Sequence, residues 1–121
     1  MGLKILIVDD TMFMRHVLRG IVEEEGWTVV GEAVNGVEAV DKYRESRPDI
    51  TTMDIVMPLK SGIEALNEIM ADDPGARVVM CSALGQEGLV EEARKAGAKG
   101  YITKPFESDQ VKDVIGTASG L

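Results

Sequence analysis

The stretch Thr52-Met53-Asp54-Ile55-Val56-Met57-Pro58 decides the fold, because a strand ends inside it. A short run with apolar members, residues 50–53, leads into Asp54, and Pro58 prevents the backbone from continuing as a regular strand. Asp54 is therefore expected at the end of a strand, at the rim of a sheet. In open α/β sheets, ligands bind at the rim formed by the carboxyl ends of the strands.

Polar residues also follow three other strand-like runs of the chain. The runs and the residues that end them are 5–8 with Asp9 and Asp10, 78–81 with Ser82, and 101–103 with Lys104. Because the carboxyl ends of parallel strands meet at one edge of a sheet, we expect these side chains to converge with Asp54.

The length and composition of the chain predict a single domain, residues 1–121, with a buried core, since 45% of the 121 residues are hydrophobic. No apolar run approaches membrane-spanning length, and the first run stops at Asp9, which does not fit a signal peptide. We therefore expect a soluble, cytoplasmic protein that does not contact a membrane.

Charge and cysteine content exclude other classes of protein. The formal net charge of −8 argues against nucleic-acid binding, which needs a basic surface. The same charge favours hard cations and basic partner surfaces. The single cysteine, Cys81, rules out an internal disulfide and a cysteine-based metal site, and its apolar neighbours indicate a core position.

Apolar residues at helical spacing separate the strand-like runs along the whole chain. Each expected strand is followed by a helix, and the strands cover residues 4–8, 27–33, 50–53, 78–81 and 100–103. Polar residues in the second strand suit the edge of a sheet better than its centre. Five strands alternating with five helices predict an α/β fold built on a doubly wound, five-stranded parallel sheet.

The fourth helix, expected over residues 86–96, is the weakest of the five. Gly85 and Gly88 lie at its start, and glycine costs about 1 kcal/mol relative to alanine inside a helix. We therefore expect this end of the helix to fray easily and to be the cheapest segment to shift.

Carboxylates that converge without cationic relief repel one another, so one of them takes up a proton or the group recruits a cation. Mg²⁺ suits such a set, because it prefers oxygen ligands and takes few protein carboxylates. A carboxylate can also act as a nucleophile and form an aspartyl phosphate. Mg²⁺, Lys104 and Ser82 would then neutralise and position the phosphoryl oxygens.

In its motifs the chain resembles the receiver domain of two-component response regulators, and most closely the stand-alone regulators of chemotaxis. The matching stretches are Ile5-Leu6-Ile7-Val8-Asp9-Asp10, Met53-Asp54-Ile55-Val56-Met57-Pro58, Ser82-Ala83 and Lys104-Pro105-Phe106. The likeness extends over essentially the whole chain. It implies the flavodoxin-like (βα)5 fold with strand order 2-1-3-4-5, for which chemotaxis regulators of this kind are a standard example.

The resemblance also implies a role for each residue of the site. Asp54 would accept a phosphoryl group from a histidine kinase of the chemotaxis type, and Lys104 and Ser82 would bind that group. Tyr101 matches an aromatic switch position that responds to Ser82. The implied ligands of Mg²⁺ are Asp9, Asp10, Asp54 and the backbone carbonyl of Val56.

Further features follow from the same resemblance. The bond between Lys104 and Pro105 is commonly cis in this family. Val56 and Leu84 occupy positions that tune how fast water attacks the phosphoryl group, so they influence the lifetime of the signal.

The implied function is a phosphorylation-activated switch that catalyses only its own phosphorylation and dephosphorylation. The output surface would be formed by the fourth helix, the last strand and the last helix, with these members: Arg94, Lys95, Lys99, Tyr101 and Lys112. The implied partners are a chemotaxis-type histidine kinase, the flagellar motor switch protein or an equivalent, and a phosphatase. We expect a monomer that binds neither nucleic acid nor a membrane.

Other interpretations stay open at this point. The chain could be a receiver excised from a longer regulator, or a phosphorelay intermediate. A magnesium-dependent phosphatase of the haloacid-dehalogenase type also uses an aspartate nucleophile, but it carries Asp-x-Asp after its first strand, where this chain has two adjacent acids. Asp9 and Asp10 could also simply cap the first helix.

Overall fold

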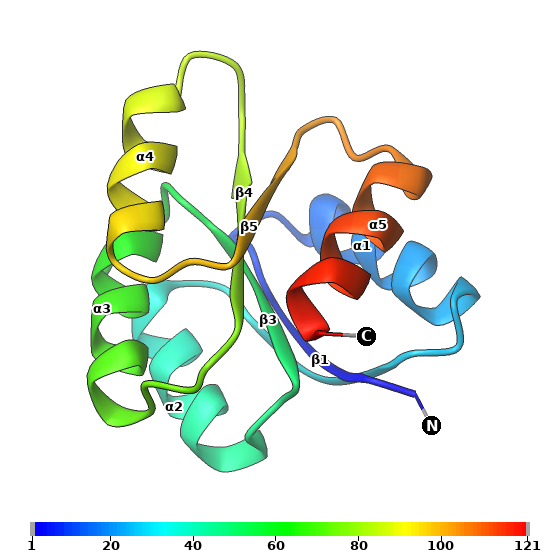
Figure 1. The fold of residues 1–121 in the computed structure, drawn as a ribbon, viewed down its shortest axis with the longest axis horizontal. Coiled ribbons are helices and arrows are strands. Elements are labelled where there is room, and N and C mark those ends of the chain that lie inside the picture. Colours follow the sequence, from blue (N-terminus) through cyan, green and yellow to red (C-terminus); the bar gives the residue numbers. More distant parts are fainter. Residues whose placement is uncertain (1, 121) are drawn as a thin grey trace.

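The computed structural model describes residues 2–120, which form one five-stranded parallel sheet with helices on both faces (Figure 1). The strands are β1 (Lys4–Val8), β2 (Thr28–Ala33), β3 (Ile50–Asp54), β4 (Val78–Ser82) and β5 (Gly100–Thr103). The helices are α1 (Met12–Glu24), α2 (Gly36–Ser46), α3 (Gly62–Asp72), α4 (Glu87–Lys95) and α5 (Ser108–Ser119). The strand order β2-β1-β3-β4-β5 confirms the predicted doubly wound fold.

The sheet separates two hydrophobic layers, and successive strand residues alternate between them. Ile5 and Ile7 of β1 pack with apolar residues of α1 and α5. Leu6 and Val8 of the same strand pack with apolar residues of α2, α3 and α4. Figure 1 shows this division, with α1 and α5 on one side of the sheet and the other three helices on the opposite side. Burial on both faces explains why β1 and β4 are almost continuously apolar, whereas β3 has the sequence Ile-Thr-Thr-Met-Asp and buries two threonines.

The edges of the sheet are β2 and β5. Most residues of β2 are only half-buried, in line with the expectation that its polar residues suit an edge. At the other edge, Tyr101 of β5 is 52% exposed. The edge of the sheet along β5 is therefore accessible to solvent.

The fourth helix is shorter than expected, because α4 covers residues 87–95 where the sequence predicted 86–96. Gln86 is its N-cap residue, and Ala96 is its C-cap residue. Gly85 has φ +90° and Gly97 has φ +114°, and glycine adopts such positive φ angles easily. These two glycines turn the chain just beyond the two ends of the helix. Within residues 2–120, no helix is long and apolar enough to cross a membrane.

Candidate functional site

Three carboxylates lie close together at the carboxyl edge of the sheet, as predicted from their positions at the ends of strands. Asp9 and Asp10 follow β1, and Asp54 is the last residue of β3. Each of the three offers a carboxylate oxygen, and these oxygens all lie within 4.8 Å of one another. Asp9 and Asp54 are buried, whereas Asp10 is exposed, so the group is reached from solvent on one side.

Lys104 joins this acidic group from the end of β5. Its Nζ lies 2.8 Å from Asp9 Oδ2 in an ion pair, and it donates a hydrogen bond of 3.1 Å to Asp54 Oδ2. Burial by itself would lower the pKa of Lys104, but the charges of Asp9 and Asp54 outweigh this effect and raise the pKa above its ordinary value. The amine is therefore held as a cation between the two buried acids.

Asp54 experiences a balance of opposing effects. Burial is the largest and raises the pKa of its carboxyl group; Lys104 lowers it, and Asp9 and Asp10 raise it again. The net result is a raised pKa. Three carboxylates face one lysine here, so the group also retains a deficit of positive charge.

The backbone holds Asp9 in place, and Asp9 is not a helix cap. Its N–H donates to the Ala33 carbonyl at 3.1 Å, and its Oδ1 accepts a hydrogen bond of 2.9 Å from the Thr11 N–H. The N-cap residue of α1 is Thr11, whose side chain makes no capping hydrogen bond. The alternative that these two acids cap the first helix is therefore wrong.

The acidic group fits a magnesium ion chemically. All of its donor atoms are carboxylate oxygens, which Mg²⁺ prefers, and the exposed Asp10 leaves room for the water ligands that Mg²⁺ keeps. Val56 lies two residues beyond Asp54 in the loop to α3, so its carbonyl stays a predicted ligand.

Two glycines position the loop between β3 and α3. The Gly62 N–H donates to the Ile55 carbonyl at 2.8 Å, and the Gly36 N–H donates to the Lys60 carbonyl at 3.0 Å. A Cβ atom at Gly62 would overlap the Asp54 carbonyl oxygen, and one at Gly36 would overlap the Lys60 carbonyl. The sequence analysis did not predict either role. The available signal was that each glycine is the first residue of a helix, Gly36 of α2 and Gly62 of α3, where a close backbone approach can require the absence of a side chain.

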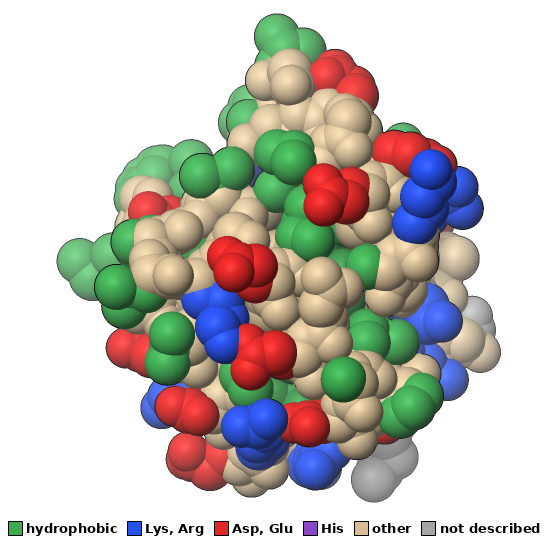
Figure 2. Space-filling model, turned by 90° about the vertical axis from the view of Figure 1, so that its left-hand side faces the viewer, with side chains coloured by type: hydrophobic (Ala, Val, Ile, Leu, Met, Phe, Trp, Pro, Cys, Tyr) green, Lys and Arg blue, Asp and Glu red, His purple; other side chains and the backbone are tan. Residues whose placement is uncertain are grey.

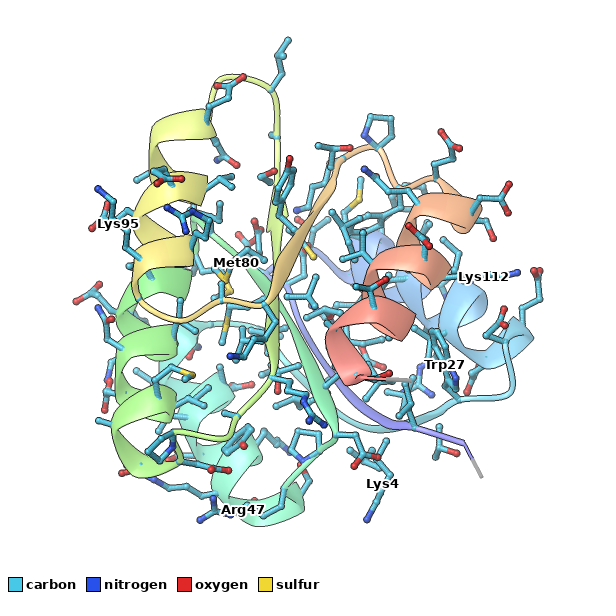
Figure 3. The ribbon with its side chains drawn as sticks, viewed as in Figure 1. Lys4, Trp27, Arg47, Met80, Lys95 and Lys112 are labelled. Carbon is cyan, nitrogen blue, oxygen red and sulfur yellow. The ribbon has the colours of Figure 1, made fainter. Side chains whose placement is uncertain are left out.

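Ser82 ends β4 beside this group and is 4% exposed. Its carbonyl accepts a hydrogen bond of 2.8 Å from the Lys104 N–H, which ties the ends of β4 and β5 together. Between these strands and α4 lies a cavity of about 700 Å³, whose walls include Ser82, Met80 and the exposed Tyr101. Figure 3 shows Met80 between α4 and β5.

The basic residues expected on one output surface lie in two separate regions, one beside α4 and one beside the end of α1. Arg94 and Lys99 line the cavity beside α4, and Lys95 also belongs to α4. Lys112 instead forms ion pairs with Glu24 and Glu25 near the end of α1, and Figure 3 shows it pointing away from α4. The inclusion of Lys112 among the residues of that face is therefore wrong. The bond between Lys104 and Pro105 is cis.

Exposed apolar side chains occupy the segments that follow the strands at the same edge of the sheet as the acidic group. Five of the exposed large hydrophobic residues lie on the loops or helix start that follow β1, β3 and β4: Met12, Phe13, Val56, Leu59 and Leu84. Figure 2 views the face formed by α2, α3 and α4, where apolar side chains lie at the upper end and along the left-hand edge, with charged side chains interspersed among them. We call these five exposed residues the apolar border of the site.

A doubly wound sheet with this strand order, and with acids after the first and third strands opposite a lysine after the fifth, defines a receiver-type signalling domain. The chain belongs to the response regulator receiver domain family, whose model matches residues 5–116. Members of this family are phosphorylation-activated signalling proteins that bind Mg²⁺, and they are not classical enzymes. This match favours the receiver domain over the alternative of a haloacid-dehalogenase-type phosphatase.

Similar proteins point to chemotaxis. The chemotaxis protein CheY of Listeria monocytogenes is 55% identical over 117 residues, which cover 97% of this chain and 98% of the relative. The chemotaxis protein CheY of Thermotoga maritima is 52% identical over 119 residues, covering 98% and 99%. A chain in the crystal structure of the CheX–CheY–BeF3–Mg²⁺ complex from Borrelia burgdorferi matches with a TM-score of 0.91 and 41% identity, covering 95% of this chain and 87% of that one.

Proposed function

We propose that Asp54 accepts a phosphoryl group from a phosphohistidine of a chemotaxis-type kinase. The supporting observation is that Asp54 ends β3 at the centre of the rim, within reach of Asp9, Asp10 and Lys104. Asp9 is less suited to this role, because its two carboxylate oxygens already contact the Thr11 N–H and Lys104. An oxygen of Asp54 bonds to phosphorus while the phosphorus–nitrogen bond of the donor breaks, and the histidine leaves with that electron pair.

The neighbouring residues supply the charge and the donors that this transfer needs. Asp9, Asp10, Asp54 and the Val56 carbonyl would hold Mg²⁺, which when bound neutralises charge on the phosphoryl oxygens. Lys104, which contacts the Asp54 carboxylate in the resting state, then forms an ion pair with the phosphoryl group. The Ser82 hydroxyl donates a hydrogen bond to a phosphoryl oxygen. Burial of Asp9, Asp54 and Ser82 keeps this set in position.

The apolar border favours a protein as the phosphoryl donor. Exposed side chains such as Phe13 (66%), Leu59 (83%) and Leu84 (96%) offer nothing to a small charged ester but can pack against a protein surface. The donor in this proposal therefore covers the rim while its histidine reaches Asp54.

The output follows from the link between Ser82 and the cavity beside α4. When Ser82 moves toward the phosphoryl group, the loop after β4 moves with it and Tyr101 turns inward. The surface of α4, β5 and α5, including Arg94, Lys95 and Lys99, then changes its affinity for a partner, in this proposal the flagellar motor switch protein or an equivalent. The proposal also includes a phosphatase partner and a monomeric, single-domain protein that acts in the cytoplasm.

Phosphorylation by a small donor tests the central assignment. Incubation with Mg²⁺ and acetyl phosphate should add one phosphoryl group, measured by intact-protein mass spectrometry. Asp54→Asn should abolish the addition, because the amide cannot act as the nucleophile. The control variant Asp41→Asn, on the exposed face of α2, should react like the wild type. Normal phosphorylation of Asp54→Asn would refute the proposal.

A further inference from the structure

Gln86 closes the loop between β4 and α4 with its side chain. Its Oε1 accepts a hydrogen bond of 2.6 Å from the Ala83 N–H, and its own N–H donates to the Ala83 carbonyl at 3.3 Å. Gln86 is also the N-cap residue of α4, yet its side chain makes no capping bond to the helix. The side chain therefore reaches back toward the strand and ties the helix start to it.

In the resting state, the end of the loop at Ser82 is anchored and the part at Leu84 is exposed. In the resting state, Ser82 is 4% exposed and its carbonyl accepts a hydrogen bond from the Lys104 N–H, so this end of the loop is anchored to the sheet. Leu84, by contrast, is 96% exposed, and Gly85 has φ +90°. In the part of the chain that the structure describes, both hydrogen bonds that close this loop join Ala83 to Gln86. The position of the loop in the resting state thus depends on Gln86.

The anchored end of the loop, at Ser82, lies beside the proposed phosphoryl acceptor. Asp54 is paired with Cys81 across the two strands, and Ile55 N–H donates to the Cys81 carbonyl at 3.3 Å. Ser82 is the next residue on β4, and Ala83 follows it directly. Any shift of the Ser82 backbone toward Asp54 therefore pulls on the Ala83 N–H that Gln86 holds.

We propose that Gln86 is a positioning residue, which holds the β4–α4 loop in its resting arrangement and is released when Asp54 carries a phosphoryl group. This inference rests on the proposed function, in which Ser82 moves toward that group. Two arrangements then compete for the loop, one closed by the Gln86 side chain and one drawn toward the phosphoryl oxygens. Removing the side-chain bond favours the second arrangement.

The size of the effect follows from the exposure of the bond. A neutral hydrogen bond at the surface changes an equilibrium modestly, which corresponds here to about 2-fold to 10-fold. Gln86 therefore tunes the switch and does not block it. A second glutamine offers a matched control, because Gln110 on α5 accepts hydrogen bonds from Thr103 N–H at 3.3 Å and Thr103 Oγ1 at 3.0 Å and so joins α5 to β5.

The test measures the affinity of the full chain for beryllofluoride, a phosphoryl mimic, at saturating Mg²⁺. Gln86→Leu, which keeps the length of the side chain and lacks the acceptor, should bind beryllofluoride about 2-fold to 10-fold more tightly than the wild type. Gln86→Glu keeps an acceptor for the Ala83 N–H and should bind it no more tightly than the wild type. Gln110→Leu should bind it like the wild type.

Hydrogen exchange at the Ala83 amide supplies a second readout in the resting state. The exchange should be faster in Gln86→Leu and unchanged in Gln110→Leu. Unchanged or weaker beryllofluoride binding by Gln86→Leu, or an equal gain in Gln110→Leu, would overturn the role of Gln86 while leaving the proposed function intact. Equal binding by Asp54→Asn and the wild type would instead overturn the proposed function, and this inference with it.

Discussion

Leu59 has an unusual backbone for an aliphatic residue, with φ +68° in the loop between β3 and α3. A left-handed conformation costs a residue with a Cβ atom about 1–2 kcal/mol, and asparagine tolerates it better than leucine. The Leu59 side chain is also 83% exposed, so packing within the chain does not repay this cost. Strain of this kind is often retained at functional sites, which agrees with a side chain that faces a partner.

Leu59→Asn should therefore stabilise the protein. We expect the free energy of unfolding, measured by urea denaturation, to rise by about 0.5–1 kcal/mol. Leu84→Asn is the matched control, because Leu84 is 96% exposed and has no positive φ; its effect should stay within about 0.5 kcal/mol. A loss of stability in Leu59→Asn would contradict this explanation.

Tyr43 provides a prediction about pH. Burial, and then the Asp73 carboxylate that accepts a hydrogen bond of 2.7 Å from its hydroxyl, raise the pKa of Tyr43 from 10.0 to about 12. A raised pKa in the folded state means that folding favours the neutral phenol. This contribution to stability is fully present below pH 10 and is lost as the pH rises toward 12.

Ultraviolet titration of the phenol in a Tyr101→Phe background should show a midpoint near pH 12 for Tyr43. Between pH 10 and pH 12, the free energy of unfolding should also fall more steeply in the wild type than in Tyr43→Phe, since lysines titrate equally in both. A midpoint near pH 10 would show that the contact with Asp73 does not persist in solution.

At the scale of the elements, β3 carries a cost inside the core. Thr51 and Thr52 are both fully buried, and within residues 2–120 neither hydroxyl has a hydrogen-bond partner. A buried hydroxyl without a partner costs about 1–3 kcal/mol, and valine has nearly the same shape. Thr51→Val and Thr52→Val should therefore each raise the free energy of unfolding by about 1 kcal/mol.

Thr103 of β5 is the matched control for these variants, because its hydroxyl donates to Gln110 Oε1 at 3.0 Å. Thr103→Val removes a bond that exists, so it should not stabilise the protein. Urea denaturation of the three variants under the same conditions makes the comparison. A gain in Thr103→Val as large as in the β3 variants would show that β-propensity alone explains the result.

The elements themselves could be predicted because each carried a local signal. The buried strands β1 and β4 are almost continuously apolar, and a polar residue marks the end of each central strand: Asp9 follows β1, Asp54 ends β3 and Ser82 ends β4. The helix faces followed from apolar spacing. The limits of α4 were less certain, since Gly85 and Gln86 differ from helical residues in backbone angles and not in their pattern of hydrophobicity.

Contacts between distant segments could not be predicted in this way. Helical periodicity does not say which neighbour a charged residue meets, so Lys112 was assigned to the wrong face while it pairs with Glu24 of α1. The close backbone approach at Gly36 joins it to Lys60 in a different part of the chain, and a single glycine does not indicate which residue it will meet. The acids converged as expected because strand ends, unlike loops, share one edge.

For the whole molecule, the acidic group is a source of instability that a cation can remove. The chain has a net charge of −8, and three of its acids meet opposite one lysine. Like charges at close range oppose folding, because the unfolded chain separates them. A cation that binds only the folded state therefore stabilises the protein through its binding free energy.

Mg²⁺ should thus raise the free energy of unfolding of the wild type, by about 2.7 kcal/mol at a concentration about 100 times its dissociation constant. The stability of Asp10→Asn relative to the wild type should differ between solutions without and with Mg²⁺. Without Mg²⁺ it should be at least as stable as the wild type, since it removes one repelling charge, and with Mg²⁺ it should gain much less, since it lacks a ligand. Asp41→Asn, away from the site on α2, should gain as much as the wild type. Urea denaturation with and without Mg²⁺ measures all three proteins, and an equal gain in Asp10→Asn would show that the stabilising ion binds elsewhere.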